Sequence, residues 1–375
     1  MCDSDKRMIL KLEKKNTELK AEIEKFKAES EQSKAELHDY KKGRLSNDTV
    51  FDQIIDDDQN LYATTGLERN EFEWILVRFE NAVKNSPNAP RFSEYANESG
   101  NTCILSVRRV LFIALSRKRN NEKQEIFAAY AHIDQSTVSR YLALADVLLM
   151  KILPTAENIA ATIRKERTIE AFKEFVPGKS AGELYLDATF VQVQRPQVDQ
   201  KKAYSGKRKR YVYNIQITSN KDGLVLDVGH PEEGSAHDME VLRRNPPNFG
   251  KWTKNMRDPN TKQEHRIILY TDKGYLGVEK DYPGIISKQP YKKPKGYEMT
   301  ETDQKYNQRI SRKRIRVEHA INRLKWFRRM SAVYDDSKEE FYKEIQVVTG
   351  LTNLHILFND RKYVKPMERV CSQIK

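Results

Sequence analysis

The segment from Glu183 to Val193 constrains the fold of this chain more than any other stretch of the sequence. Its bulky or β-branched residues are Leu184, Tyr185, Leu186, Phe190, Val191 and Val193. Such a dense apolar run is typical of a strand that is buried on both faces at the centre of a sheet. Asp187 stands in the middle of it. Because a buried carboxylate without a partner costs several kcal/mol, this aspartate needs a counter-charge, and we favour a metal ion.

The charge of the chain favours a polyanionic partner. Among its 375 residues, 67 are Lys or Arg and 54 are Asp or Glu, which gives a net charge of +13. A surplus of this size favours nucleic acid first, although a protein that is merely basic and soluble would show the same charge. The length allows two or three domains.

The cysteines and the hydropathy pattern bear on the compartment. Cys2, Cys103 and Cys371 fit neither a disulfide framework nor a zinc pattern, which favours a reducing compartment. The sequence contains no signal peptide and no apolar run of spanning length. We therefore expect a soluble intracellular protein without membrane contact, located in the nucleus if eukaryotic and otherwise in the cytoplasm or nucleoid.

Residues 1–42 carry a heptad pattern that predicts a coiled coil. The seam consists of Ile9, Leu12, Asn16, Leu19, Ile23, Phe26, Ser30, Ser33, Leu37 and Tyr40. An asparagine at an a-type position, here Asn16, often fixes the register of a parallel dimer. We expect a homodimer through residues 5–40, with a lone solvated helix as the alternative.

Residues 101–155 have the pattern of a helix-turn-helix domain, after a linker over 43–100 with a short helical patch. Apolar periodicity predicts helices over 104–115 and 122–130, then a turn that ends at Asp134 as a helix N-cap, and a third helix from Gln135. The residues expected to contact DNA are Gln135, Ser136, Thr137, Ser139 and Arg140. A three-helix bundle without DNA is the alternative.

A connecting segment (156–178) leads into an α/β domain (179–365) and a tail (366–375). Beyond the first strand, the pattern predicts strands over 211–218, 224–228 and 266–270, a helix opening at 233–240, and helices over 304–330 and 341–358. The Asp222-Gly223 pair indicates a hairpin between the second and third strands. The Pro- and Lys-rich stretch 288–296 is expected to be irregular.

Asp187, Asp272 and Glu318 are the candidate metal ligands and catalytic residues. Asp272 follows the strand 266–270, and Glu318 lies on the long basic helix. Helical geometry places Arg314 and Lys325 in the same narrow stripe as Glu318, because offsets of four and eleven residues return to nearly the same angle. This carboxylate would then stand between two cations at the margin of the buried face.

These motifs resemble those of transposases with an RNase H-like fold and a DDE triad, most closely the Harbinger-like and related bacterial insertion-sequence group. The segments that carry the resemblance are Leu186-Asp187-Ala-Thr189, Tyr204–Arg210, Gly234–Asp238, Thr271–Tyr275 and Arg314–Lys325. The tyrosine of the group's Tyr-Arg-Glu-Lys signature would fall at Ser311, where this chain departs from it.

The resemblance implies an α/β, RNase H-like catalytic domain behind a helix-turn-helix domain and an N-terminal coiled coil. It also implies two divalent cations, Mg²⁺ or Mn²⁺, shared by the three carboxylates, and double-stranded DNA, both element ends and target, as substrate. Cleavage would free a 3′-hydroxyl that attacks target DNA. Asp238, Arg314 and Lys325 would be accessory residues, and the basic run Lys207, Arg208, Lys209 and Arg210 would contact phosphates.

Each of these residues also has a simpler interpretation. Asp272 alone fits an ordinary turn aspartate, Glu318 alone fits an ion pair with Arg314 or Lys325, and the basic run could be a solvated surface or a nuclear import signal. Two other functions remain open: a domesticated, catalytically silent DNA-binding protein derived from a transposase, and an RNase H-like nuclease that acts on RNA. The combination of three carboxylates in this order favours the transposase.

Overall fold

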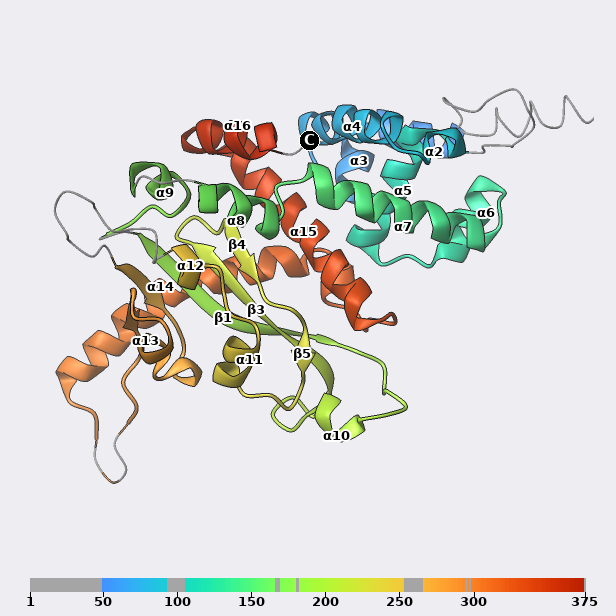
Figure 1. Cartoon of the computed structure of the whole chain (residues 1–375). Coiled ribbons are helices and arrows are strands. Elements are labelled where there is room, and N and C mark those ends of the chain that lie inside the picture. The colour runs from blue at the N-terminus through green and yellow to red at the C-terminus, as the bar shows by residue number, and fades with distance from the viewer. Residues whose placement is uncertain are drawn as a thin grey trace, which may run out of the picture.

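A computed structural model describes residues 49–92, 105–165, 169–179, 182–252, 266–293, 296 and 298–373. The coiled coil predicted over 1–42, and the dimer that depends on it, lie outside the described residues. Figure 1 shows a sheet with helices packed around it and a group of N-terminal helices beside it. No helix in the described ranges combines the length and the apolar character needed to cross a membrane.

The sheet mixes antiparallel and parallel strands. Among the described residues its strands are β1 (Glu183–Gln192), β2 (Tyr204–Ser205), β3 (Arg210–Asn220), β4 (Val225–Val228), β5 (Glu232–Glu233), β6 (Ile267–Tyr270) and β7 (Ile285–Lys288). The order is β2-β3-β1-β6-β7, and β4 and β5 pair with β3. Strand β3 is antiparallel to β1 and β4, whereas β1, β6 and β7 run parallel. The chain therefore has the α/β fold that its sequence predicts.

Strand β1 lies in the middle of this sheet and is covered on both faces, as expected. Leu184 and Leu186 pack into one apolar cluster, together with Leu269 of β6. Tyr185 packs into another cluster, together with Val317 of the long helix. Successive side chains of a strand point to opposite faces, so this division between two clusters follows from the apolar run itself.

The predicted hairpin is present between β3 and β4. The amide of Gly223 donates to the carbonyl of Asn220 at 3.2 Å, and the amide of Asn220 donates to the carbonyl of Leu224 at 3.0 Å. Gly223 has a φ of +88°, a conformation that glycine adopts without steric cost. This turn later forms one wall of a pocket.

Two long helices pack against the sheet and against each other. The first, α14 (Glu301–Lys325), contacts β1 and β3 and buries Ile310, Val317, Ala320, Ile321 and Leu324. The second, α15 (Lys338–Asn359), is buried along most of its length, which explains its continuous apolar character. Both helices are close to their predicted positions, although the helix predicted to reach residue 330 ends at Lys325 and is followed by the 3-10 turn η5 (Arg328–Met330).

The segment 43–100 differs from the predicted linker. Its described part contains α2 (Thr49–Asp56), α3 (Asp58–Thr65) and α4 (Arg69–Lys84). The apolar residues that these helices bury include Ile55, Leu61, Phe72, Ile75 and Phe79. These residues join one core with the following helices, so the acidic run around Asp57 lies on the surface of a packed unit.

The next helices are α5 (Val107–Asn120), α6 (Gln124–Ala131) and α7 (Gln135–Ile152), close to the three predicted ones. His132, with a φ of +50°, ends α6, and a three-residue connection leads into α7. Asp134 occupies the N-cap position of α7, but its side chain makes no capping hydrogen bond, in contrast to the expected role. Val138 and Leu142 of α7 are buried.

A buried ionic cluster joins the N-terminal helices to α15. Lys118 Nζ on α5 lies 2.6 Å from Asp146 Oδ1 on α7 and 3.0 Å from Glu344 Oε1 on α15. Arg329 Nε lies 3.7 Å from the other oxygen of Glu344. Burial raises the pKa of Asp146, whereas the two cations hold the pKa of Glu344 below its usual value.

Shorter elements complete the described chain. They are η1 (Ala89–Arg91), α8 (Ala156–Lys165), α9 (Ile169–Phe175), α10 (Gln200–Ala203), α11 (Asp238–Arg244), α12 (Phe249–Trp252), η4 (Lys273–Tyr275), α13 (Val278–Asp281), η6 (Arg361–Tyr363) and α16 (Val364–Gln373). The helix expected to open at 233–240 begins at Asp238, because Glu232 and Glu233 pair with β3 as β5. The expected tail is helical as far as Gln373.

Candidate active site

The register between β1 and β6 brings Asp187 and Asp272 to the same end of the sheet. These parallel strands pair Tyr185 with Tyr270. Asp187 lies two residues further along β1, and Asp272 lies two residues beyond the end of β6, so both follow the last residues that these two strands pair. Strand geometry therefore accounts for the approach of two carboxylates that are far apart in the sequence.

Arg314 on α14 lies against both aspartates. Its Nη2 is 3.2 Å from Asp187 Oδ2, and its Nη1 is 3.6 Å from Asp272 Oδ1. The side chain of Asp187 is 22% exposed and that of Arg314 is 15% exposed, so both partners lie largely out of the solvent. The guanidinium of Arg314 thus supplies a positive charge to both partly buried carboxylates.

Glu318 comes from the next turn of the same helix and is more exposed than the aspartates. Burial raises the pKa of Asp187, and the carboxylates of Asp272 and Glu318 raise it further. Arg314 and the amide of Ala188, which donates to Asp187 Oδ1 at 2.8 Å, act in the opposite direction. The three candidate acids therefore share one electrostatic environment.

Asp238 is a fourth acid near this group, at the start of α11. Burial and the carboxylate of Asp272 raise its pKa, whereas Lys207 and His237 lower it. A Cβ atom at position 274 would overlap Asp238 Oδ2, so Gly274 allows this carboxylate to lie directly against the Asp272–Tyr275 turn. The accessory acid proposed from the sequence lies beside the candidate triad.

A buried polar pair supports the acids from within the sheet. Gln216 Nε2 of β3 donates to the carbonyl of Asp238 at 2.7 Å and to the hydroxyl of Tyr275 at 3.2 Å. Burial and three neighbouring carboxylates raise the pKa of Tyr275, so this phenol stays neutral. Sequence reasoning missed both residues. The only signal was a glutamine at a strand position where the neighbouring residues are apolar.

Lys325 and the basic loop meet at Phe190. The Arg208 guanidinium lies 4.2 Å from the centre of the Phe190 ring, and Lys325 Nζ lies 4.8 Å from it. Burial and the nearby Arg208 lower the pKa of Lys325. Lys207, Lys209 and Arg210 are exposed, and Arg210 also bonds Gln192 at 3.0 Å. Phe190 thus brings together a cation of the basic loop and a cation of α14.

The donor set suits a hard divalent cation, because every candidate ligand is a carboxylate oxygen. The partly buried, mutually repelling acids need a counter-charge, and a lone guanidinium reaches two of them. Within the part of the chain that the structure describes, no three acidic, histidine or cysteine side chains are grouped closely enough to hold an ion as they stand. The residues fit the chemistry of a metal site, and the guanidinium of Arg314 contacts both aspartates.

The residues expected to read DNA lie apart from the acids, at the start of α7 (Figure 1). Gln135, Ser136 and Arg140 are exposed, whereas Thr137 and Ser139 are half-buried. Gln135 Nε2 donates to Gln124 Oε1 at 2.6 Å, and Arg140 bonds Ser136 and Thr137 on its own helix. The acids and the first turns of α7 are therefore two separate surfaces.

Two comparisons with known proteins point to one family. Residues 186–353 match the family described as DDE superfamily endonuclease. The chain is also 27% identical over 215 residues to a protein of Microchaete diplosiphon named "Probable transposase for insertion sequence element IS702". This alignment covers 57% of this chain and 71% of that protein. No solved structure matches the chain significantly. Residues 186–353 are therefore similar to the DDE superfamily endonucleases, and the chain is similar to an insertion-sequence transposase, which confirms the resemblance seen in its motifs.

Proposed function

We propose that this protein is a DNA transposase, or an endonuclease derived from one, that binds element ends and cleaves and joins DNA strands. The observation that carries the proposal is the pair Asp187 and Asp272, which both lie just beyond the last paired residues of β1 and β6 and are joined by Arg314. Its family and the transposase relative support the same activity.

The sheet supports an RNase H-like assignment for the catalytic domain. Strand β3 pairs in antiparallel fashion with β1 and with β4. On its other side, β1 pairs with the parallel strand β6, which in turn pairs with β7. The candidate acids then come from β1, from the end of β6, and from the helix α14 that follows β7.

Asp187, Asp272 and Glu318 would hold the divalent cations, either Mg²⁺ or Mn²⁺, with two ions as the proposed number. These ions would activate water and relieve charge on the leaving oxygen of the phosphodiester. Asp187, the least exposed of the three acids, would be the shared ligand. Arg314 would turn from the carboxylates toward the phosphate, and Lys325 would contact the DNA backbone beside Phe190.

Two basic surfaces would hold the DNA. The α6–α7 pair would act as a helix-turn-helix, with Gln135, Ser136, Thr137, Ser139 and Arg140 near base edges and phosphates. Three residues of the exposed turn between β2 and β3 (Lys207, Arg208 and Lys209) and the first residue of β3 (Arg210) would contact phosphates near the acids.

Incubation of the purified protein with candidate terminal-repeat DNA and Mn²⁺ tests the activity. We expect nicking that disappears in the Asp187→Asn variant while DNA binding persists. Glu301→Gln, on the same helix as Glu318 but largely exposed, serves as the control that should nick normally. Tight binding without nicking by the unaltered protein would instead support a catalytically silent derivative, and preference for RNA–DNA hybrids would support an RNA nuclease.

The proposed homodimer has a separate test. Deletion of residues 1–42 should convert the protein into a monomer, as measured by light scattering, because the heptad seam is confined to this segment. A dimer of unchanged stability after this deletion would refute the role of the coiled coil.

A further inference from the structure

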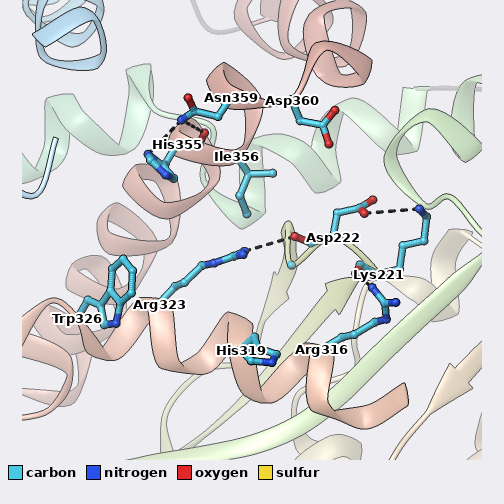
Figure 2. A pocket seen from close by; sticks show the side chains of 11 residues that line it. Lys221, Asp222, Arg316, His319, Arg323, Trp326, His355, Ile356, Asn359 and Asp360 are labelled. Carbon is cyan, nitrogen blue, oxygen red and sulfur yellow. Dashed lines mark hydrogen bonds and ion pairs between the residues drawn. The ribbon is translucent and has the colours of Figure 1, made fainter. Parts of the chain in front are cut away.

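A pocket of about 690 Å³ lies between α14, the end of α15 and the turn that joins β3 to β4. Figure 2 shows Arg323 extending from α14 toward this turn, with Trp326 further along the same helix and His355 above it on α15. The volume falls in the range of pockets that hold small molecules or single nucleotides. It is not part of the acid site.

The pocket and the acids use different sides of α14. The pocket residues on this helix and at its end are Arg316, His319, Arg323 and Trp326. The last three follow Arg316 by three, seven and ten residues, and this spacing places all four on one side of a helix. Glu318 belongs to the stripe of Arg314 and Lys325, which lies more than a quarter turn away around the helix axis. One helix thus separates two functional surfaces.

The positive charges of the pocket have few carboxylate partners. Arg316 Nη1 donates to the carbonyl of Lys221 at 2.6 Å, and Arg323 Nη1 donates to the carbonyl of Asp222 at 3.3 Å. Within the described ranges, neither guanidinium forms an ion pair. The acidic groups of the pocket are neutralised elsewhere, because Lys362 Nζ lies 3.1 Å from Asp222 and 2.5 Å from Asp360. The pocket therefore has a net positive character suited to an anion.

Trp326 adds an aromatic surface beside these cations. Trp326 is 62% exposed, whereas Trp252 is only 2% exposed and Trp74 packs edge to face against Phe358. The backbone carbonyl of Trp326 accepts a hydrogen bond from Arg119 at 2.8 Å, so the helix end is held in place while the indole ring stays open. An exposed indole beside guanidinium groups that have no carboxylate partner among the described residues is the combination that binds single-stranded nucleic acid by stacking and by phosphate contacts.

We propose that this pocket binds an unpaired nucleotide of a DNA strand, with the base stacked on Trp326 and the flanking phosphates on Arg316 and Arg323. The proposal rests on the proposed function in that DNA processing would supply unpaired strand near the acids. A duplex does not fit this role, because its bases are already stacked on one another and their faces cannot reach the indole. The pocket would hold a strand that has left the duplex, on the side of α14 away from the carboxylates.

Binding of a short oligo(dT) tests the proposal on the full chain without metal. Thymine should quench the fluorescence of Trp326, and anisotropy of a labelled oligo(dT) gives the affinity. Trp326→Ala should weaken binding by roughly tenfold, the scale of one stacked base, and should remove the quenching. A double variant, Arg316→Gln with Arg323→Gln, should also reduce the slope of log affinity against log salt by about 1.4, because each phosphate contact on a single strand contributes about 0.7.

Arg243→Gln is the matched control, since Arg243 is an exposed guanidinium that pairs with Asp281 on α13. It should bind oligo(dT) like the unaltered protein. Because the double arginine variant could distort the β3–β4 turn, Trp326→Ala provides an independent test: Trp326 is largely exposed, and circular dichroism should show an unchanged fold. An unlabelled duplex of the same length should compete at least about tenfold less well than the single strand.

Unchanged oligo(dT) affinity in Trp326→Ala, or equal competition by duplex, would overturn the proposal. The same test separates this proposal from the activity at the acids. Asp187→Asn should lose nicking and keep oligo(dT) affinity. Failure of nicking in the unaltered protein, together with binding that depends on Trp326, would refute the proposed function and leave the pocket supported.

Discussion

The guanidinium of Arg314 lies 3.2 Å from Asp187, in the position that a cation bound to this carboxylate would compete for. The same guanidinium reaches Asp272 at 3.6 Å. The site therefore contains its own counter-ion when it holds no metal. This relationship explains how a strand as apolar as β1 tolerates a carboxylate in its middle.

Replacement of Arg314 by methionine should make the protein more dependent on divalent cations for stability. Without metal, the variant should lose about 1 to 3 kcal/mol, because Asp187 and Asp272 are left without their shared cation. Millimolar Mn²⁺ should then raise the melting temperature of Arg314→Met more than that of the unaltered protein. Differential scanning fluorimetry measures both values, with the exposed Arg312→Met as control, and equal Mn²⁺ shifts in all three proteins would contradict the account.

Replacement of Gly274 by alanine tests whether Asp238 must lie close to the acids. The added Cβ would overlap Asp238 Oδ2 and push this carboxylate away from Asp272 without removing its charge. We expect nicking in Mn²⁺ to fall by roughly tenfold or more, since small displacements at a reacting centre are costly. Gly206→Ala is the control, because no atom lies within 4 Å of its added Cβ. Equal nicking by the two variants would remove Asp238 from the site.

The buried lysine of the ionic cluster should matter far more than a surface lysine. Lys118→Met leaves Asp146 without its partner and should lower the free energy of unfolding by about 3 to 5 kcal/mol. Lys343→Met removes an exposed pair with Glu340 and should cost less than about 1 kcal/mol. Urea unfolding measures both, and similar losses would show that the cluster does not join α5, α7 and α15.

The pair of His355 and Glu71 predicts a dependence of stability on pH. His355 Nδ1 lies 2.8 Å from Glu71 Oε1, and this buried carboxylate holds the pKa of the histidine above its usual value of 6.5. Because the folded state has the higher pKa, the stabilisation is complete below pH 6.5 and is lost as the pH rises through the raised value. Urea unfolding between pH 6 and 9 should show a decline that His355→Gln abolishes. The control His319→Gln should retain it, and a decline that persists in His355→Gln would point to another group.

Local patterns in the sequence accounted for much of the fold. The apolar run of β1 and the Asp222-Gly223 turn depend only on neighbouring residues, so the central strand and its hairpin were predictable. Strand β7 (Ile285–Lys288) was missed because it is short and runs directly into a Pro- and Lys-rich stretch. The helices α2–α4 were also missed as a packed unit, because their apolar positions are interspersed with charged residues and become buried against helices such as α5, α7 and α15.

The acids of the candidate site could be predicted from the sequence, whereas most contacts of the neighbouring side chains could not. A carboxylate within β1 and another directly after β6 are unusual enough to identify from the sequence alone. The contacts of Arg314 with both aspartates, and of Phe190 with Arg208 and Lys325, depend on the strand register and on how α14 rotates against the sheet. Those quantities are set by tertiary packing, and no local pattern encodes them.

Cleavage of the polypeptide by ion-generated radicals tests most directly whether the three acids share a metal site. With Fe²⁺ in place of Mg²⁺, added ascorbate and peroxide should cut the backbone near residues 187, 272 and 318, and the fragments can be mapped by mass spectrometry. The account predicts cuts in all three segments that excess Mg²⁺ suppresses together and that Asp187→Asn removes together. Cuts confined to one segment, or cuts that Mg²⁺ does not suppress, would contradict a shared site.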